Sequence, residues 1–224
     1  MLTLVLTKRD HRESDEIVTF LSKEKGKIQL LAKGTKKIKS KNSYLLEPFS
    51  FVDVQTARGK TWNRVTKVDG LEYFKELRED HNKGLIAGYS AKLVDKVLEE
   101  GEDTPGVFKL LLEWLSYLKN NPTNPFLLDA FVLQLISLVG FKPDLEPAEE
   151  VVGFSVSEGR FIESGAGSYL KCSKETAENL KSALSVDFSK PEHLEYDPKM
   201  HNIIYKFSNY HLGQKLPDWR KIID

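Results

Sequence analysis

The sequence predicts an α+β protein in which a five-stranded β-barrel precedes an α-helical bundle that carries a small inserted β-hairpin. Residues 1–70 consist of short β-rich runs separated by turn residues, and from about residue 76 the apolar positions recur with a helical period. Residues 142–167 interrupt the helical pattern. We therefore expect a barrel domain at residues 1–75, a helical domain at residues 76–141 and 173–224, and an inserted hairpin at residues 142–172.

The barrel is predicted from five β-rich runs. In the first run, Leu2, Leu4 and Leu6 alternate with Thr3, Val5 and Thr7, which is typical of a half-buried strand. Gly59 lies in the expected turn between the last two runs. Five strands over this length favour a small barrel of the OB type. The expected strands cover residues 2–7, 17–21, 27–32, 49–56 and 62–68.

The first helices are predicted from spacing and capping. Leu85, Tyr89, Leu93 and Val97 recur at every fourth position. Thr104 followed by Pro105 is typical of an N-cap and first helical position, and we expect the helix to cover residues 107–119.

The most apolar stretch, residues 126–139, predicts the central helix of the bundle. It follows Asn124-Pro125 and has only three polar residues, among them Asp129. It is too short to span a bilayer and too apolar to lie on a surface. Two further helices are expected, after Ser173 and after Asp197-Pro198, and a last short one from Pro217.

The inserted region is predicted to be a hairpin because two strand-like runs, residues 151–156 and 160–163, flank Glu158-Gly159.

The charge distribution is asymmetric although the chain is formally neutral. Residues 1–70 contain 15 basic and 8 acidic residues, a net charge of +7, and the remainder carries −7. The first part would attract a polyanion. The single cysteine, Cys172, excludes an intrachain disulfide and an all-cysteine metal site, and is typical of a reducing cytosol. Met1 leads directly into a strand pattern, so no signal peptide is expected.

A run of five lysines in nine residues, with no acidic residue, lies between the third and fourth expected strands. Such a run indicates sequence-independent contact with phosphates, or a solvated loop without a partner. Other basic residues lie in the expected turn after the first strand, at the second turn, and beside the last hairpin. If these turns share a face, they form a groove that follows a phosphate backbone. The candidate basic residues are Lys8, Arg9, Arg12, Lys27, Lys33, Lys36, Lys37, Lys39, Lys41, Arg58, Lys60 and Arg64.

Two aromatic residues near this set, Trp62 and Tyr44, are candidates for stacking on bases, as in OB barrels that bind single strands. Packing within the barrel or its hairpin is an equally valid interpretation of Trp62.

The sequence favours a binding protein rather than an enzyme. Its five histidines are scattered without ligand spacing, and no glycine-rich phosphate loop is present. The acidic residues 99–103 are interpreted as solvated, and Cys172 as a packing residue. No catalytic residue, metal or cofactor is expected.

Several segments, taken in their order and spacing along nearly the whole chain, resemble the RecO family of bacterial recombination mediators. The first contains Glu13-Ser14-Asp15 and a hydrophobic strand, and the last contains His211-Leu212-Gly213. The segments are residues 12–21, 26–28, 32–34, 47–49, 138–145 and 211–216.

The resemblance implies DNA repair and homologous recombination in the RecFOR pathway, in the bacterial cytoplasm at the nucleoid. Family members bind single- and double-stranded DNA, anneal complementary strands, and with RecR help load RecA on DNA coated by the single-strand binding protein SSB. They need no ATP. The family binds the acidic, apolar-tipped SSB tail in the helical domain, for which the candidate cations here are Lys92, Lys96, Arg220 and Lys221.

One departure concerns zinc. Many relatives carry two C-x-x-C pairs in the inserted hairpin, and the corresponding positions here are Ala148, Val151, Glu163 and Ala166. These cannot build a tetrahedral zinc site. We therefore expect a metal-free, zinc-ribbon-like region held by packing of residues such as Val152, Phe154, Phe161 and Ile162.

Two other functions remain open from the sequence. The same basic loop suits an OB protein that binds RNA. Alternatively, the chain is a scaffold whose acidic helical part binds proteins.

Overall fold

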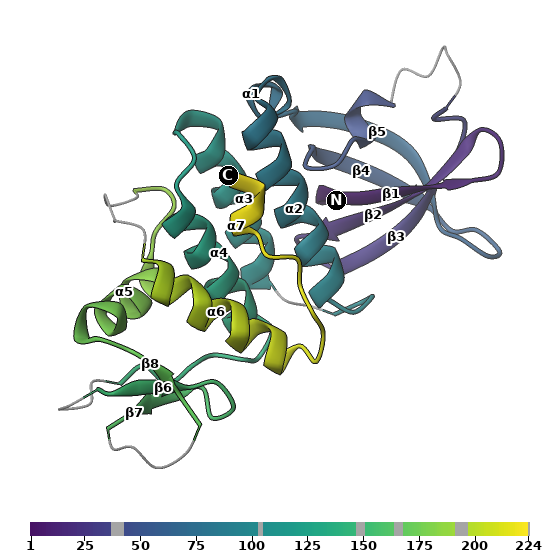
Figure 1. Cartoon of the computed structure of the whole chain (residues 1–224). Helices are drawn as coiled ribbons and strands as arrows, with labels where there is room; N and C mark the ends of the chain where they lie inside the picture. The colour runs from purple at the N-terminus through teal and green to yellow at the C-terminus, as the bar shows by residue number, and fades with distance from the viewer. Residues whose placement is uncertain (37–42, 103–104, 147–150, 164–167, 191–196, 224) are drawn as a thin grey trace. The chain divides into compact units, whose positions relative to one another are not determined.

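The computed structural model describes residues 1–36, 43–102, 105–146, 151–163, 168–190 and 197–223 (Figure 1). Packing divides the chain into two compact units, Met1–Asn121 and Pro122–Asp224. The helices that follow the barrel belong to the first unit together with it. The expected domain boundary after residue 75 stays a prediction.

The first unit contains the predicted five-stranded barrel, which confirms the fold class. The sheet closes in the order β1-β2-β3-β5-β4, and β3 meets β5 in parallel at a single pair, Leu31 and Arg64. Val5, Phe20 and Val54 belong to the apolar cluster that fills the interior. The strands are β1 (Leu2–His11), β2 (Asp15–Ser22), β3 (Gly26–Ala32), β4 (Phe51–Ala57) and β5 (Arg64–Glu72).

Strand β1 differs from its prediction in length and in burial. It continues to His11, so Lys8 and Arg9 lie on the strand and not in a turn. Its middle is buried on both faces, since Leu4, Val5 and Leu6 have no exposed surface. Val5 points into the barrel, and helix α2 (His81–Val97) packs against β1, so the strand is not half-buried.

The last two strands begin later than predicted. Strand β4 starts at Phe51 and β5 at Arg64, which leaves Phe49 and Trp62 in loops. Gly59 lies in the connecting loop as expected.

Three helices follow the barrel in the first unit: α1 (Lys75–Glu79), α2 (His81–Val97) and α3 (Pro105–Asn120). The helical period from residue 76 is confirmed, but the stripe chosen from the sequence only partly follows the buried face of α2, since Leu93 is buried and Tyr89 and Val97 are half-buried. Leu85 is 45% exposed, whereas Ile86, Ala91 and Val94 are buried. The buried face therefore lies about one position farther along the chain than the every-fourth-residue stripe.

The second unit is a small helical bundle. Helix α4 (Pro125–Leu138) is buried along most of its length, as predicted, and packs against α5 (Lys174–Ser185) and α6 (Pro198–His211). Three predicted N-caps are confirmed, because the side chains of Asn124, Ser173 and Asp197 accept hydrogen bonds from backbone N–H groups of the first turns, whereas Thr104 lies outside the described residues. The short helix α7 (Arg220–Ile223) follows Asp218.

The inserted region is a three-stranded sheet in the order β7-β6-β8, not only a hairpin. Its strands are β6 (Gly153–Ser155), β7 (Arg160–Ile162) and β8 (Leu170–Lys171). Phe154 and Phe161 are buried and meet edge to face at 6.0 Å between ring centroids. Val152 is exposed, which corrects its predicted packing role.

Of the four positions aligned with the zinc cysteines, Ala148 and Ala166 lie outside the described residues.

None of the described helices has the length and apolarity needed to cross a membrane.

Candidate nucleic-acid interface

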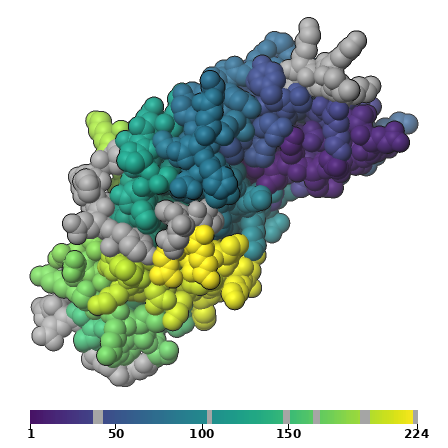
Figure 2. Space-filling model, turned by 45° about the horizontal axis from the view of Figure 1, so that its top comes forward, coloured from purple at the N-terminus to yellow at the C-terminus, as the bar shows by residue number. Residues whose placement is uncertain are grey.

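An open groove of about 840 Å³ lies on the barrel where β3 and β5 meet. The backbone N–H of Leu31 donates to the carbonyl oxygen of Asn63 at 2.9 Å, which fixes the loop after β4 beside the end of β3. In space-filling view, atoms of the first strands (purple) adjoin atoms of later segments of the same unit (blue) (Figure 2). The groove is lined by His11, Arg12, Leu31, Lys33, Arg58, Gly59, Lys60, Thr61, Trp62 and Arg64.

Two backbone features shape the groove. Arg12 has φ of 61° in the turn between β1 and β2, a conformation that few residues other than glycine adopt. Gly59 allows the loop between β4 and β5 to fold on itself, because a Cβ there would lie 2.1 Å from the carbonyl oxygen of Trp62. These turns bring residues from both hairpins to one surface.

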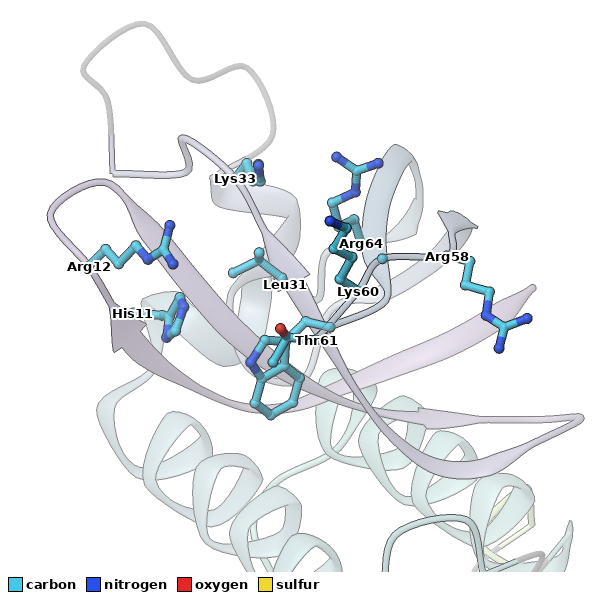
Figure 3. Close-up of a pocket in the computed structure, with 10 residues that line it drawn as sticks. His11, Arg12, Leu31, Lys33, Arg58, Lys60, Thr61 and Arg64 are labelled. Carbon is cyan, nitrogen blue, oxygen red and sulfur yellow. The ribbon is translucent and has the colours of Figure 1, made fainter.

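Five of the lining residues are cations that are exposed and available. No carboxylate lines the groove, and within the described residues none of the five forms an ion pair. Arg12 approaches from one side and Lys60 and Arg64 from the other, while the guanidinium of Arg58 points away (Figure 3). The groove thus concentrates positive charge that no protein group neutralises. The five cations are Arg12, Lys33, Arg58, Lys60 and Arg64.

Trp62 is the aromatic residue of the groove. It is half-buried, and the guanidinium of Arg9 lies over its ring, 5.9 Å from the centroid. Arg9 is thereby associated with the groove through Trp62. Tyr44 does not line the groove; it is 54% exposed and meets Tyr73 edge to face at 5.8 Å.

The structure gives Lys8 a local partner. Its Nζ lies 2.7 Å from Glu47 and 3.3 Å from Glu16. Burial acts to lower the pKa of Lys8, but the hydrogen bond and charge of Glu47, supported by Glu16, outweigh burial and raise that pKa. The charge of Lys8 is therefore balanced within the barrel.

Lys27 is placed away from the groove and joins the barrel to α2. Its Nζ lies 2.9 Å from the Asp95 carboxylate and donates to the carbonyl oxygens of Asp95 and Leu98. Thr7 donates to the same carboxylate at 2.7 Å. A lysine that closes the C-terminal end of a helix in this way is structural, and we leave it out of the proposed interface.

Two of the five lysines in the run lie within the described residues. Lys33 lines the groove, and Lys36 is paired with Asp10 at 2.6 Å. Lys37, Lys39 and Lys41 lie outside the described residues.

The candidate partner-binding cations belong to different units. Lys92 and Lys96 are exposed one turn apart on α2 in the first unit. Arg220 and Lys221 are exposed on α7 in the second unit, where Arg220 lies 3.4 Å from Asp218.

Two buried titratable groups of the second unit, Cys172 and Asp129, have a structural role. Burial raises the pKa of Cys172 to about 11, so its thiol is unreactive at neutral pH. Asp129 is fully buried and accepts hydrogen bonds at 2.7 Å from Trp219 and from the ring of His201. Burial raises the pKa of Asp129, an effect that His201 opposes. No cluster that could hold a metal ion occurs among the described residues.

Sequence reasoning did not select four groove residues: His11, Leu31, Gly59 and Thr61. Leu31 and Thr61 carry no signal in the sequence, because only the closure of the barrel brings them together. His11 precedes Arg12 at a strand end, and that adjacency is a signal that could have identified it.

Comparison with known proteins gives matches over nearly the whole chain. The family model described as "Recombination protein O N terminal" matches residues 3–74, and "Recombination protein O C terminal" matches residues 78–220. The DNA repair protein RecO of Syntrophomonas wolfei is 34% identical over 143 residues, 64% of this chain and 57% of that protein.

Two other relatives named DNA repair protein RecO align over more of the chain. That of Pelotomaculum thermopropionicum is 30% identical over 96% of this chain and 90% of its own length. The protein of Desulforamulus reducens is 28% identical over 95% of this chain and 89% of its own length. Neither matched family model describes a catalytic family.

Proposed function

Because the chain belongs to the recombination protein O (RecO) family, and thus has a role in DNA repair and recombination, we propose that its barrel groove binds single- and double-stranded DNA. The groove would hold the phosphate backbone, since its cations carry no sequence preference.

One observation carries this proposal: five exposed cations line a single groove that no carboxylate of the described residues lines. Lysine and arginine that neutralise phosphates release condensed counterions, and this release supplies most of the free energy of non-specific DNA binding. Cations already paired with carboxylates would release fewer counterions. The absence of ion pairs to these five among the described residues therefore favours a polyanionic ligand.

Strand annealing is the next step of the proposal. Two complementary strands repel each other until cations neutralise their phosphates. An open groove can neutralise one strand while leaving its base edges accessible to the other. Trp62 adds a flat surface on which a base of a single strand can stack.

We further propose that the chain works with RecR to promote RecA loading on DNA coated by SSB, without ATP hydrolysis. The acidic SSB tail needs cations beside apolar groups, and the exposed Lys92, Lys96, Arg220 and Lys221 are candidates for that contact.

A competition assay tests the proposal. The full chain is bound to a fluorescent single-stranded DNA, and unlabelled DNA or RNA of the same length and sequence is added. We expect single-stranded DNA to compete better than RNA. Duplex DNA should also compete. Stronger competition by RNA would favour the alternative of an RNA-binding OB protein, and no binding to either would favour a protein scaffold.

Annealing is measured with the same protein. Two complementary labelled strands should pair faster when the full chain is present. An unchanged annealing rate at saturating protein would contradict this part of the proposal.

A further inference from the structure

Histidine is the side-chain type that changes its charge near neutral pH, and His11 lines the groove together with the five cations. It is the last residue of β1, is half-buried, and lines the groove beside Arg12 (Figure 3). Within the described residues its ring has no hydrogen-bond or ion-pair partner. His201, in the core of the helical bundle, is by contrast fixed between Asp129 and Asp218.

The charged residues that line the groove together with His11 are cationic, whereas its neighbours on β1 and β2 include two acidic residues. Its register partner on β2 is the acidic Asp15, whose carboxylate accepts a hydrogen bond from the backbone N–H of Gly34 at 2.9 Å. The neighbouring Asp10 on β1 is paired with Lys36. The remaining charged groups come from the turn after β1, the end of β3, the loop after β4 and the start of β5: Arg12, Lys33, Arg58, Lys60 and Arg64.

This arrangement makes the charge of His11 depend on whether the groove is occupied. In the free protein the five cations of the groove form no ion pair within the described residues. A phosphate in the groove neutralises those cations and accepts a hydrogen bond from the protonated ring, so it favours the imidazolium form.

We propose that His11 takes up a proton from solvent when a DNA phosphate enters the groove, so that the affinity for DNA increases as the pH falls. This inference rests on the proposed function and adds a binding residue and a form of regulation to it. The proton binds the free ring nitrogen, and the resulting N–H donates to a phosphate oxygen. By linkage, a ligand that promotes protonation binds more tightly where protonation is easier.

The expected change in DNA affinity with pH follows from the effect of a nearby opposite charge on a basic group. A nearby anion favours the charged form of a basic group by about one to three factors of ten. For a half-exposed ring we expect the lower limit, about one factor of ten in all, of which about fivefold falls between about pH 8 and pH 6.

The test is a series of DNA titrations at fixed salt with the full chain. The probe is a labelled oligo-dT of about 16 nucleotides, the upper limit of the site sizes of single OB folds. Thymine does not titrate in this range, so the protein alone contributes to the pH dependence. His11→Gln should lose the increase at low pH. The matched control, His81→Gln, changes an exposed histidine outside the groove and should keep it.

Two further measurements complete the test. Calorimetry of the wild-type protein in two buffers with different ionisation enthalpies should report proton uptake on binding, and His11→Gln should abolish it. His11→Lys carries a permanent charge and should bind tightly without the pH-dependent increase.

A wild-type affinity that does not change with pH, or a His11→Gln variant that retains the increase, would overturn this inference while leaving the proposed function intact. Failure of the proposed function has a different signature, since the oligonucleotide would then bind at no pH.

Discussion

Removal of two groove lysines should reduce both DNA affinity and its salt dependence. The change is Lys33→Gln with Lys60→Gln, which removes two exposed cations that line the groove and have no ion pair among the described residues. Each lysine is expected to contact one phosphate. For single-stranded DNA, each lost contact lowers the slope of log affinity against log salt by about 0.7, so the double variant should lower it by about 1.4.

The same relation gives the loss of affinity. The counterion term disappears near 1 M salt, so two lost contacts lower the affinity about 15-fold at about 0.15 M salt. The assay is a set of fluorescence anisotropy titrations of the full chain with oligo-dT at several salt concentrations. Affinity should fall equally for all base sequences, because phosphate contacts carry no sequence information.

The control variant is Lys23→Gln with Lys25→Gln. These two lysines are exposed in the turn between β2 and β3, do not line the groove, and have no ion pair among the described residues. The control therefore removes the same charge from the same barrel by the same chemical change. If both double variants shift the slope equally, long-range charge accounts for binding and the groove is refuted as the phosphate site.

Two other predictions separate binding from structure. Trp62→Ala should weaken single-stranded DNA binding by about 1–3 kcal/mol, the range for one stacked base, and change duplex binding less; a lower unfolding midpoint with unchanged affinity would instead support the packing interpretation. Lys27→Met should lower the free energy of unfolding by about 1–3 kcal/mol in urea titrations, because it leaves two helix-terminal carbonyl groups without their donor and the Asp95 carboxylate without its cation. The exposed Lys25→Met is its control, and loss of salt slope in Lys27→Met without loss of stability would show that Lys27 contacts phosphate.

The barrel was predictable because its strands are short, β-rich and separated by turn residues. What the sequence could not supply was the second face of each strand. Leu4 and Leu6 alternate correctly with Val5, yet all three are buried, since a helix about 80 residues later covers the outer face. The same limit explains Leu85, because a stripe of apolar residues indicates a helix but does not identify its buried side when polar and small residues share that side.

The candidate site was predictable only in part, for a reason specific to charge. Counting basic residues identifies a cationic region but not the partners of each cation. Lys27 finds Asp95, which is 68 residues away in the chain, and Lys8 finds Glu47 at a distance of 39 residues. Arg58, Lys60 and Arg64 have no such partner among the described residues, so their prediction as groove residues agrees with their geometry.

The position of the groove follows from the way the barrel closes. β3 and β5 pair only at Leu31 and Arg64, and the residues that line the groove come from the ends of these strands and from the neighbouring turns. Each turn contributes cations, and their mutual repulsion opposes folding of the barrel. The apolar interior that includes Val5, Phe20 and Val54 must offset this cost. A surface that retains unpaired cations at the expense of stability is expected where a polyanion binds, since the ligand removes the repulsion that the fold tolerates.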